Sequence, residues 1–223
     1  MAEGLLVVVS GPSGCGKGTI CRKFLQRNED MNISISATTR SPRRGEKDGV
    51  NYFFLTEDVF KKMVSKNEFL EYANVHGNFY GTPKKYVLDK IKKGENIFLE
   101  IDIQGALQIK KIYPNGVFVF ILPPSMEELK NRIIRRGTES KSDIDRRYKN
   151  AFKEIEYINE YDYAIVNDKV EKAVKKLESI VTAEKSKVDR QIELINKILL
   201  WGGFLCYILL LMKWQKKQIV DIL

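Results

Sequence analysis

The stretch that decides the fold is "LLVVVSGPSGCGKGT", residues 5–19. Its five leading apolar residues are typical of a buried strand, and they run directly into a glycine-rich turn. Gly11, Gly16 and Lys17 satisfy the G-x-x-x-x-G-K part of the phosphate-loop signature. Glycines let successive backbone N–H groups turn inward around an anion, and the following helix directs its positive end at the same point. We therefore predict a strand, a phosphate-binding loop and a helix.

The loop departs from the strict signature at one position. Gly18 stands where the signature has Ser or Thr for magnesium, and Thr19 follows one place later. We expect the Thr19 hydroxyl to act on the ion only through water. The alternative is an ordinary strand-to-helix turn, which the flanking strand and helix patterns disfavour. The residues predicted to hold the phosphate chain are Gly11, Pro12, Ser13, Gly14, Cys15, Gly16, Lys17, Gly18 and Thr19.

Composition indicates a globular chain with an anionic partner. The 223 residues are 43% hydrophobic and 30% charged, and 38 basic against 29 acidic residues give a net charge of +9. Charge alone does not separate nucleic acid from phosphorylated nucleotides. The three cysteines are scattered without metal-binding spacing, which fits a reducing cytosol. The first strand follows too closely on Met1 for a signal peptide, so we expect a cytoplasmic protein.

Strand-like runs at residues 5–9, 97–101, 117–122 and 163–166 alternate with helical stretches. This alternation predicts an α/β fold with a parallel sheet and helices on both faces. Ser125 and Glu128 form a capping box that opens a helix to about residue 135, and Ser142 opens another to about residue 161. Residues 170–187 read as an amphipathic helix against the core.

Between residues 36 and 85 the pattern changes. Short β-like pieces, "NYFFL", "EFLEYA" and "NFYGT", surround a helix that begins near Thr56, which predicts a small insertion off the main sheet. Inside it, Arg40 and Arg43 flank Pro42, and Tyr52 follows. Guanidinium groups grip phosphate bidentately and a tyrosine hydroxyl can complete the shell. A second phosphate site beside a phosphate loop indicates two phosphorylated substrates.

Six motifs in matching order carry a resemblance to a known family. They are "SGPSGCGKGT", "TTRSPRRGEKDGVNYFF", "EYANVHGNFYGT", "FLEIDIQGA", "RRGTE" and "YDYAIVND". Over about residues 4–190 the chain resembles guanylate kinase, a phosphate-loop nucleoside-monophosphate kinase. The resemblance implies a parallel core sheet, a mixed GMP-binding insertion at about 36–90 and a lid at about 134–148, the last including the polar stretch 135–143. It also implies that ATP and GMP, with dGMP as a further acceptor, react with Mg²⁺ to give ADP and GDP.

The resemblance also implies residue roles. Lys17 and the lid arginines Arg136 and Arg147 would act on the transferring phosphate, and Asn167 would lie near the donor base. The positions that match GMP-phosphate contacts are Arg40, Arg43, Tyr52 and Tyr80; those that match guanine contacts are Ser36, Glu71, Thr82 and Asp102. Asp102 is placed for a water-mediated contact with magnesium or guanine, and no direct protein ligand to the metal is implied.

Chemistry supports Glu71 as the base reader. One carboxylate can accept from both N1–H and the 2-amino group of guanine, whereas adenine lacks both donors and would leave the desolvated carboxylate unpaired. Three other assignments have plain alternatives. Asp102 is also a typical helix cap, Arg147 is also a typical solvated helix residue, and His76 is not needed as a base because the acceptor phosphate is already ionised near neutral pH.

Two rival classes remain as alternatives. The first is a catalytically inactive guanylate kinase-like protein-binding module, which the presence of Lys17, Arg136 and Arg147 disfavours. The second is a nucleic-acid-binding protein, which the clustering of arginines in two nucleotide motifs disfavours.

Residues 191–223 form a tail outside the resemblance. Residues 198–212, "ILLWGGFLCYILLLM", carry no charge, but fifteen residues fall short of the about 20 that a membrane-spanning helix needs. A tail anchor, an oligomer contact and a non-native extension all stay open, the anchor being the less favoured. The sequence does not decide the oligomeric state.

Overall fold

The computed structural model describes residues 3–75, 77–135 and 141–201. A five-stranded, all-parallel sheet forms its centre, in the order β2 (Met31–Ile33), β7 (Asn96–Glu100), β1 (Leu6–Ser10), β8 (Val117–Leu122), β9 (Tyr163–Val166). Every residue of β1 is buried, as expected for the central strand of a sheet covered on both faces. The four predicted strands are confirmed to within a residue. The prediction missed β2, because three residues at a sheet edge are too short to show a pattern.

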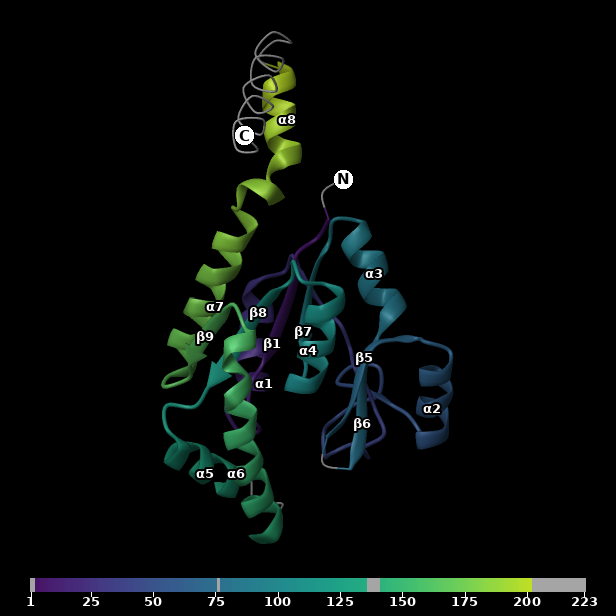
Figure 1. Cartoon of the computed structure of the whole chain (residues 1–223), viewed down its shortest axis with the longest axis vertical. Helices are drawn as coiled ribbons and strands as arrows, with labels where there is room; N and C mark the ends of the chain where they lie inside the picture. Colours follow the sequence, from purple (N-terminus) through teal and green to yellow (C-terminus); the bar gives the residue numbers. More distant parts are fainter. Residues whose placement is uncertain (1–2, 76, 136–140, 202–223) are drawn as a thin grey trace, which may run out of the picture.

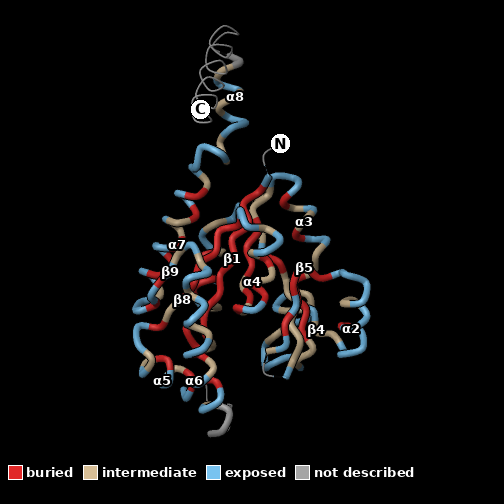
Figure 2. The backbone as a smooth tube through the Cα atoms, in the orientation of Figure 1, coloured by how far each residue is buried: buried red, intermediate tan, exposed pale blue. Residues whose placement is uncertain are grey.

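Helices cover both faces of this sheet (Figure 1). Because successive side chains of a strand point to opposite faces, Val7 and Val9 face one cluster and Leu6 and Val8 face another. The first cluster is closed by α1 (Lys17–Arg27) and α7 (Val170–Lys185), the second by α3 (Lys84–Lys92) and α4 (Ile103–Ile112). The buried residues concentrate along these strands (Figure 2). The predicted α/β architecture is confirmed.

A second, mixed sheet carries the insertion. Its order is β4 (Phe53–Phe54), β3 (Ala37–Thr38), β6 (Asn78–Pro83), β5 (Phe69–Val75), with β3 parallel to β4 and the other pairs antiparallel. Helix α2 (Glu57–Ser65) begins after Thr56, whose hydroxyl caps it by accepting from the Val59 N–H at 3.4 Å. Phe60 of α2 stacks on Phe69 and Phe79, with ring centroids 4.4 and 5.5 Å apart. This small aromatic core holds the helix on the sheet.

Two helices after β8 differ in detail from prediction. The helix α5 (Met126–Arg135) begins after Ser125, which accepts from the Glu128 N–H at 3.0 Å. The Glu128 carboxylate accepts from Arg132 at 2.8 Å, so the reciprocal half of the capping box is replaced by an ion pair within the helix. The next helix, α6 (Lys141–Ile155), ends earlier than predicted and tightens into a 3₁₀ turn, Glu156–Glu160. After that turn, the Tyr161 ring packs edge to face on Phe120, with ring centroids 4.8 Å apart.

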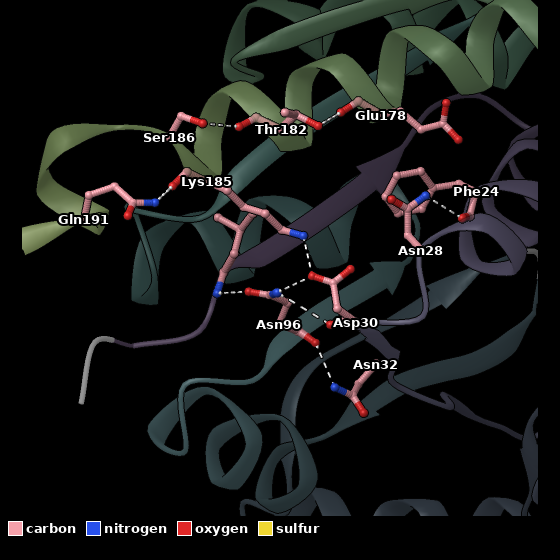
Figure 3. A network of polar contacts seen from close by, with 11 residues as sticks. Phe24, Asn28, Asp30, Asn32, Asn96, Glu178, Thr182, Lys185, Ser186 and Gln191 are labelled. Atoms are coloured by element: carbon pink, nitrogen blue, oxygen red, sulfur yellow. Dashed lines mark hydrogen bonds and ion pairs between the residues drawn. The ribbon is translucent and has the colours of Figure 1, made fainter. Parts of the chain in front are cut away.

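A polar network ties the amino ends of three strands to α7 (Figure 3). The Asn96 side chain accepts from the Leu5 N–H at 3.0 Å and donates to the Asp30 carboxylate at 3.1 Å. Lys185 of α7 pairs with the same carboxylate at 2.5 Å, and this hydrogen bond lowers the pKa of Asp30. The network holds together the amino ends of these strands, at the end of the sheet opposite to the phosphate loop.

Helix α8 (Ile192–Trp201) extends away from the sheet beyond α7 (Figure 1). Its Ile192, Leu194 and Ile198 side chains are 52%, 54% and 62% exposed. Within the described ranges, none of the helices has the length and apolar character needed to cross a membrane. The predictions for the rest of the tail concern residues 202–223, which lie outside the described residues.

Candidate active site

A cavity of about 200 Å³ opens at the carboxyl ends of β1 and β7, where parallel α/β sheets usually bind ligands. A larger one, about 900 Å³, lies at the opposite end of the sheet beside Tyr113 and Arg190 and has no glycine loop. The smaller cavity joins three parts of the molecule: the phosphate loop, the insertion and α6. Its polar lining consists of Ser13, Lys17, Ser36, Tyr52, Glu71, Tyr80, Glu100, Asp102 and Glu154.

The phosphate loop needs its glycines for both conformation and space. Gly11, Gly14 and Gly16 have φ values of 146°, 92° and 94°, in the region that L side chains rarely adopt. A Cβ at Gly11 would lie 2.3 Å from the Ile121 carbonyl oxygen. The loop closes with a bond from the Cys15 N–H to the Pro12 carbonyl at 3.2 Å, and α1 begins at Lys17. Strand, loop and helix are arranged as the sequence predicts.

Lys17 lies over this loop. Its ammonium group donates to the Gly11 carbonyl and, at 3.3 Å, to the Pro12 carbonyl. Gly18 faces the carboxylate of Glu100, because a Cβ there would lie 3.4 Å from Oε1. Burial raises the pKa of Glu100, while the Lys17 charge opposes that rise. Thr19 is exposed on the first turn of α1.

Helix α6 meets the loop at Ser13. Arg147 is buried, 8% exposed, and its guanidinium donates to the Ser13 hydroxyl, so it is no solvated helix residue. The Ser13 N–H in turn donates to the Glu154 carboxylate at 3.3 Å. Arg136, the other predicted lid arginine, lies outside the described residues.

The phosphate loop is also hydrogen-bonded to the segment that follows β9. Asn167 is buried and donates to the Cys15 carbonyl at 2.8 Å, while its own Oδ1 is buried and has no hydrogen-bond partner within the described ranges. Arg132 donates to the carbonyls of Cys15 and Asn167 at 3.4 and 3.1 Å. Burial raises the pKa of the Cys15 thiol, so Cys15 fills space in its protonated form.

Arg40, Tyr52 and Tyr80 come together on the insertion. The Arg40 guanidinium lies 5.5 Å from the Tyr52 ring centroid, and the Tyr52 and Tyr80 rings meet edge to face at 6.0 Å. Burial raises the pKa of Tyr52 to about 12, so its hydroxyl remains a donor. Glu46 pairs with Arg40 at 3.0 Å and accepts from the Arg43 N–H at 2.7 Å. Arg43 itself is exposed and does not line the cavity.

Glu71 and Ser36 line the cavity on the insertion side, whereas Thr82 is fully buried behind Glu71 and does not line it. Glu71 is 3% exposed, and its Oε1 accepts from the Thr82 hydroxyl at 2.6 Å. Its other oxygen, Oε2, is buried and has no hydrogen-bond partner among the residues that the structure describes. Burial raises the pKa of Glu71 to about 8, although the Thr82 hydrogen bond lowers it. An orphaned buried acceptor of this kind fits a ligand that brings its own donors.

Asp102 does act as a helix cap. Its Oδ1 accepts from the N–H groups of Gln104 and Gly105 at 2.8 and 3.2 Å and so starts α4. It also lines the cavity, where burial raises its pKa. The capping alternative and the ligand-facing position are therefore compatible.

Sequence reasoning missed four residues that organise the site: Glu46, Glu100, Arg132 and Glu154. Glu100 had one usable signal, since it shares the end of a strand with Asp102 in "FLEID". Glu46 also had a local signal, since its partners Arg40 and Arg43 lie six and three residues before it. Arg132 and Glu154 meet the phosphate loop only through folding, because Cys15 and Ser13 lie far from them in the chain.

Comparison with known proteins agrees with this geometry. The family model described as guanylate kinase matches residues 3–184. Curated guanylate kinases from Caldanaerobacter subterraneus subsp. tengcongensis and Clostridium acetobutylicum are 54% and 60% identical over 196 and 188 residues. These alignments cover 88% and 84% of this chain and 95% and 90% of the relatives. A crystal structure of guanylate kinase from Anaplasma phagocytophilum superposes with a TM-score of 0.73 at 37% identity, covering 85% of this chain and 90% of that one. The chain therefore belongs to the guanylate kinase family.

Proposed function

We propose that this guanylate kinase transfers the γ-phosphate of ATP to GMP across the cavity between its phosphate loop and its insertion. The observation that carries the proposal is the buried Glu71 carboxyl group, which lines the same cavity as Lys17 and whose Oε2 has no hydrogen-bond partner in the described part of the chain. One end of the cavity suits a guanine base and the other suits a phosphate chain. GMP would bridge the two with its phosphate directed at the loop.

The donor phosphates would occupy the loop. Backbone N–H groups of Gly14, Gly16 and Lys17 would hold the phosphate chain at the positive end of α1. Lys17 would exchange its present carbonyl acceptors for the outer phosphates. Asn167, whose buried Oδ1 has no partner among the described residues, would accept from a donor group of the ATP base.

The acceptor would lie against the insertion. Arg40, Tyr52 and Tyr80 would hold the GMP phosphate, and Arg43 would reach it from its exposed position on the same loop. Glu71 would accept from N1–H and the 2-amino group of guanine, with Ser36, Thr82 and Asp102 as neighbouring contacts. AMP offers Glu71 no matching donors, so its binding would leave the buried carboxyl group without the hydrogen bonds that guanine would supply.

The reaction needs positioning and charge neutralisation rather than a general base. Lys17 and Arg147 would neutralise charge on the transferring group, and the proposed role of Arg136 is the same. Ser13 connects the loop to α6, so Arg147 is held at the point where donor and acceptor phosphates would meet. His76 is not required.

Magnesium fits the donor set as a cofactor of ATP. Mg²⁺ prefers oxygen ligands and keeps several waters, and Glu100 and Asp102 present carboxylates to the cavity beside the phosphate loop. When bound, the ion supplies positive charge to the phosphate oxygens. Glu100 and Asp102 would orient its water shell, with Thr19 as a more distant contact. The Glu100 carboxylate faces Gly18, which stands where the signature has a Ser or Thr for magnesium. This position supports a role for Glu100 in place of the absent hydroxyl.

The inactive protein-binding module has no support, because Lys17 and Arg147 are present and both contact the phosphate loop. We further propose that residues 1–190 form the catalytic domain, with a GMP-binding insertion at about 36–90 and a lid at about 134–148. We also propose that dGMP is accepted and that the enzyme works in the cytoplasm.

A coupled ADP-release assay with GMP, dGMP, AMP and UMP tests the proposal. We expect turnover with GMP and dGMP and little with the others. Glu71→Gln places a donor amide opposite a guanine donor, so the efficiency with GMP should fall by about 2–4 kcal/mol of transition-state binding. The preference for GMP over AMP should shrink with it. Unchanged discrimination in this variant would show that guanine is read elsewhere, with Ser36 and Thr82 as the next candidates.

A further inference from the structure

Gly105 lies in the first turn of α4, where glycine is a poor choice. It occupies the third helical position after the Asp102 cap and is buried. Glycine in a helix is about 1 kcal/mol less favourable than alanine, and the helical backbone here does not require it. The reason for this glycine must therefore be space.

The space is taken by Glu71. A Cβ at Gly105 would lie 2.3 Å from the Glu71 Oε2 atom and 2.8 Å from its Cδ. The carboxyl group thus lies directly against the bare Cα of Gly105. The crowded atom is the same oxygen that has no hydrogen-bond partner among the described residues, and it belongs to a side chain that lines the cavity.

A second contact sets the distance between α4 and the strand that carries Glu71. Tyr72 follows Glu71 on β5, which is the edge strand of the insertion sheet. The Gln108 side chain accepts from the Tyr72 N–H at 3.3 Å and donates to the Tyr72 carbonyl at 2.7 Å. It satisfies the backbone of this edge strand as a neighbouring strand would. Gln108 lies one turn after Gly105, so the two contacts act side by side.

We propose that Gly105 and Gln108 are specificity-determining positioning residues: α4 sets the place of the Glu71 carboxylate and thereby the preference for guanine. Gly105 provides the space and Gln108 holds the strand at the right distance. Neither side chain needs to touch the substrate. The inference rests on the proposed role of Glu71 as the guanine reader.

Gly105→Ala is the direct test. The added methyl group forces Oε2 to move by about 1 Å, a misplacement that can cost about 100-fold. We expect kcat/KM for GMP to fall about 10- to 100-fold and the ratio of GMP to AMP binding constants to fall with it. The KM for ATP should stay within about twofold, since the phosphate loop is untouched. The melting temperature should fall by only a few degrees, because the better helix propensity of alanine partly offsets the cost of crowding a buried carboxyl group.

The matched control is Gln104→Ala, which creates the same side chain on an exposed position of the same turn and should leave all these quantities unchanged. A second test shortens the side chain at position 71. In a Gly105→Ala/Glu71→Asp double variant, the carboxylate retracts from the new methyl group. The double variant should therefore lose less than the two single losses combined. Gln108→Glu removes the donor to the Tyr72 carbonyl and should likewise lower the preference for GMP over AMP. This variant tests the inference independently if Gly105→Ala does not fold.

The outcomes separate the inference from the function it rests on. If Glu71→Gln loses guanine discrimination and Gly105→Ala and Gln108→Glu do not, the positioning role is overturned and the reader stands. If Glu71→Gln itself keeps discrimination, the reader assignment fails, and the inference fails with it. Equal losses for GMP and ATP, together with a larger fall in melting temperature, would mean a merely structural role and would also overturn the inference.

Discussion

At the scale of the residue, Glu71 is the central group of the proposed GMP site. Its carboxyl group lies away from water and accepts one hydrogen bond from Thr82, and no other described residue bonds to Oε2. Burial disfavours the charged form and raises the pKa of Glu71 to about 8. A guanine that supplies two N–H donors would reverse that balance. The binding of base and the ionisation of this residue are therefore linked.

This linkage predicts a pH dependence. Below pH 8 the free enzyme holds Glu71 protonated, and guanine must bind with release of that proton. The dissociation constant for GMP should therefore fall as pH rises from about 6 to 8, by up to about tenfold per unit, and level off above. Calorimetry of GMP binding in buffers of different ionisation enthalpy would measure the number of protons released. In Glu71→Gln this dependence should disappear, and its persistence there would assign the proton to another group.

The same shift has the opposite sign for stability of the free protein. A carboxyl whose pKa is raised on folding contributes stability below its unfolded value, near 4.5, and loses it as pH rises through about 8. Relative to Glu71→Gln, the wild-type chain should therefore become less stable as pH rises from 5 to 8.5. Urea unfolding of both chains at several pH values measures this. A constant difference across that window would contradict the buried, elevated pKa.

Lys17 offers the simplest test of the donor site. Lys17→Ala removes the only side-chain charge that the loop itself carries and leaves its glycines intact. We expect kcat to fall by several orders of magnitude with the fold unchanged, because charge neutralisation is the main source of catalysis. Circular dichroism provides the check on folding. Turnover near that of the wild type would rule out the assignment of Lys17.

At the scale of the element, α6 contacts the phosphate loop through two side chains. Arg147 and Glu154 lie seven residues apart, two helical turns, so they share one face, and both contact Ser13. One offers the loop a cation and the other an anion. A movement of this helix would therefore change the charge at the loop directly.

Arg147→Ala tests this arrangement. If the guanidinium stabilises the transferring phosphate, kcat should fall by about 10²–10³, the range for loss of one preorganised donor, while the KM for GMP changes little. Arg146→Ala is the matched control, since Arg146 is the exposed neighbour on the same helix. Steady-state kinetics of both variants gives the comparison. Equal effects at the two positions would mean that general charge on α6, and not its contact with Ser13, is responsible.

At the scale of the whole molecule, two sheets meet at one cavity, while the C-terminal elements lie at the far edge. The cavity is lined at the carboxyl ends of the core strands, and α8 leaves the molecule beyond α7 (Figure 1). The turn Val188–Arg190 is still held to the core, because Arg190 donates to the Asn115 carbonyl at 2.8 Å. No residue that lines the active-site cavity comes after Glu154 among those that the structure describes.

We therefore predict that residues 191–223 are dispensable for catalysis. A chain that ends at Arg190 should keep its kcat and its KM for GMP and should be more soluble, since exposed apolar side chains on α8 favour association. Size-exclusion chromatography and liposome flotation beside the full-length chain would distinguish an oligomer contact from a lipid contact. Loss of turnover at equal folded fraction would show that the tail supports the core and that the proposed domain boundary is misplaced.

The sequence by itself determined the features that depend on neighbours along the chain. Residues 5–19 specify strand, loop and helix, because a buried apolar run, glycines at positive φ and a following lysine are all local requirements. The parallel sheet follows from alternating apolar runs, and the start of α2 follows from Thr56, a residue type that caps helices. Two arginines around a proline were enough to suggest a second phosphate site.

Tertiary structure alone decided which of these side chains meet. Ser13 and Glu154 are 141 residues apart in the chain, and Arg132 is 117 residues from the carbonyl it binds on Cys15. Gly105 looks unremarkable until the Glu71 carboxylate occupies the place of its missing side chain. Arg43, in contrast, stays exposed although its motif groups it with Arg40. Burial, and with it the raised pKa of Glu71, arises only when distant segments exclude water together, and no pattern along the chain encodes that by itself.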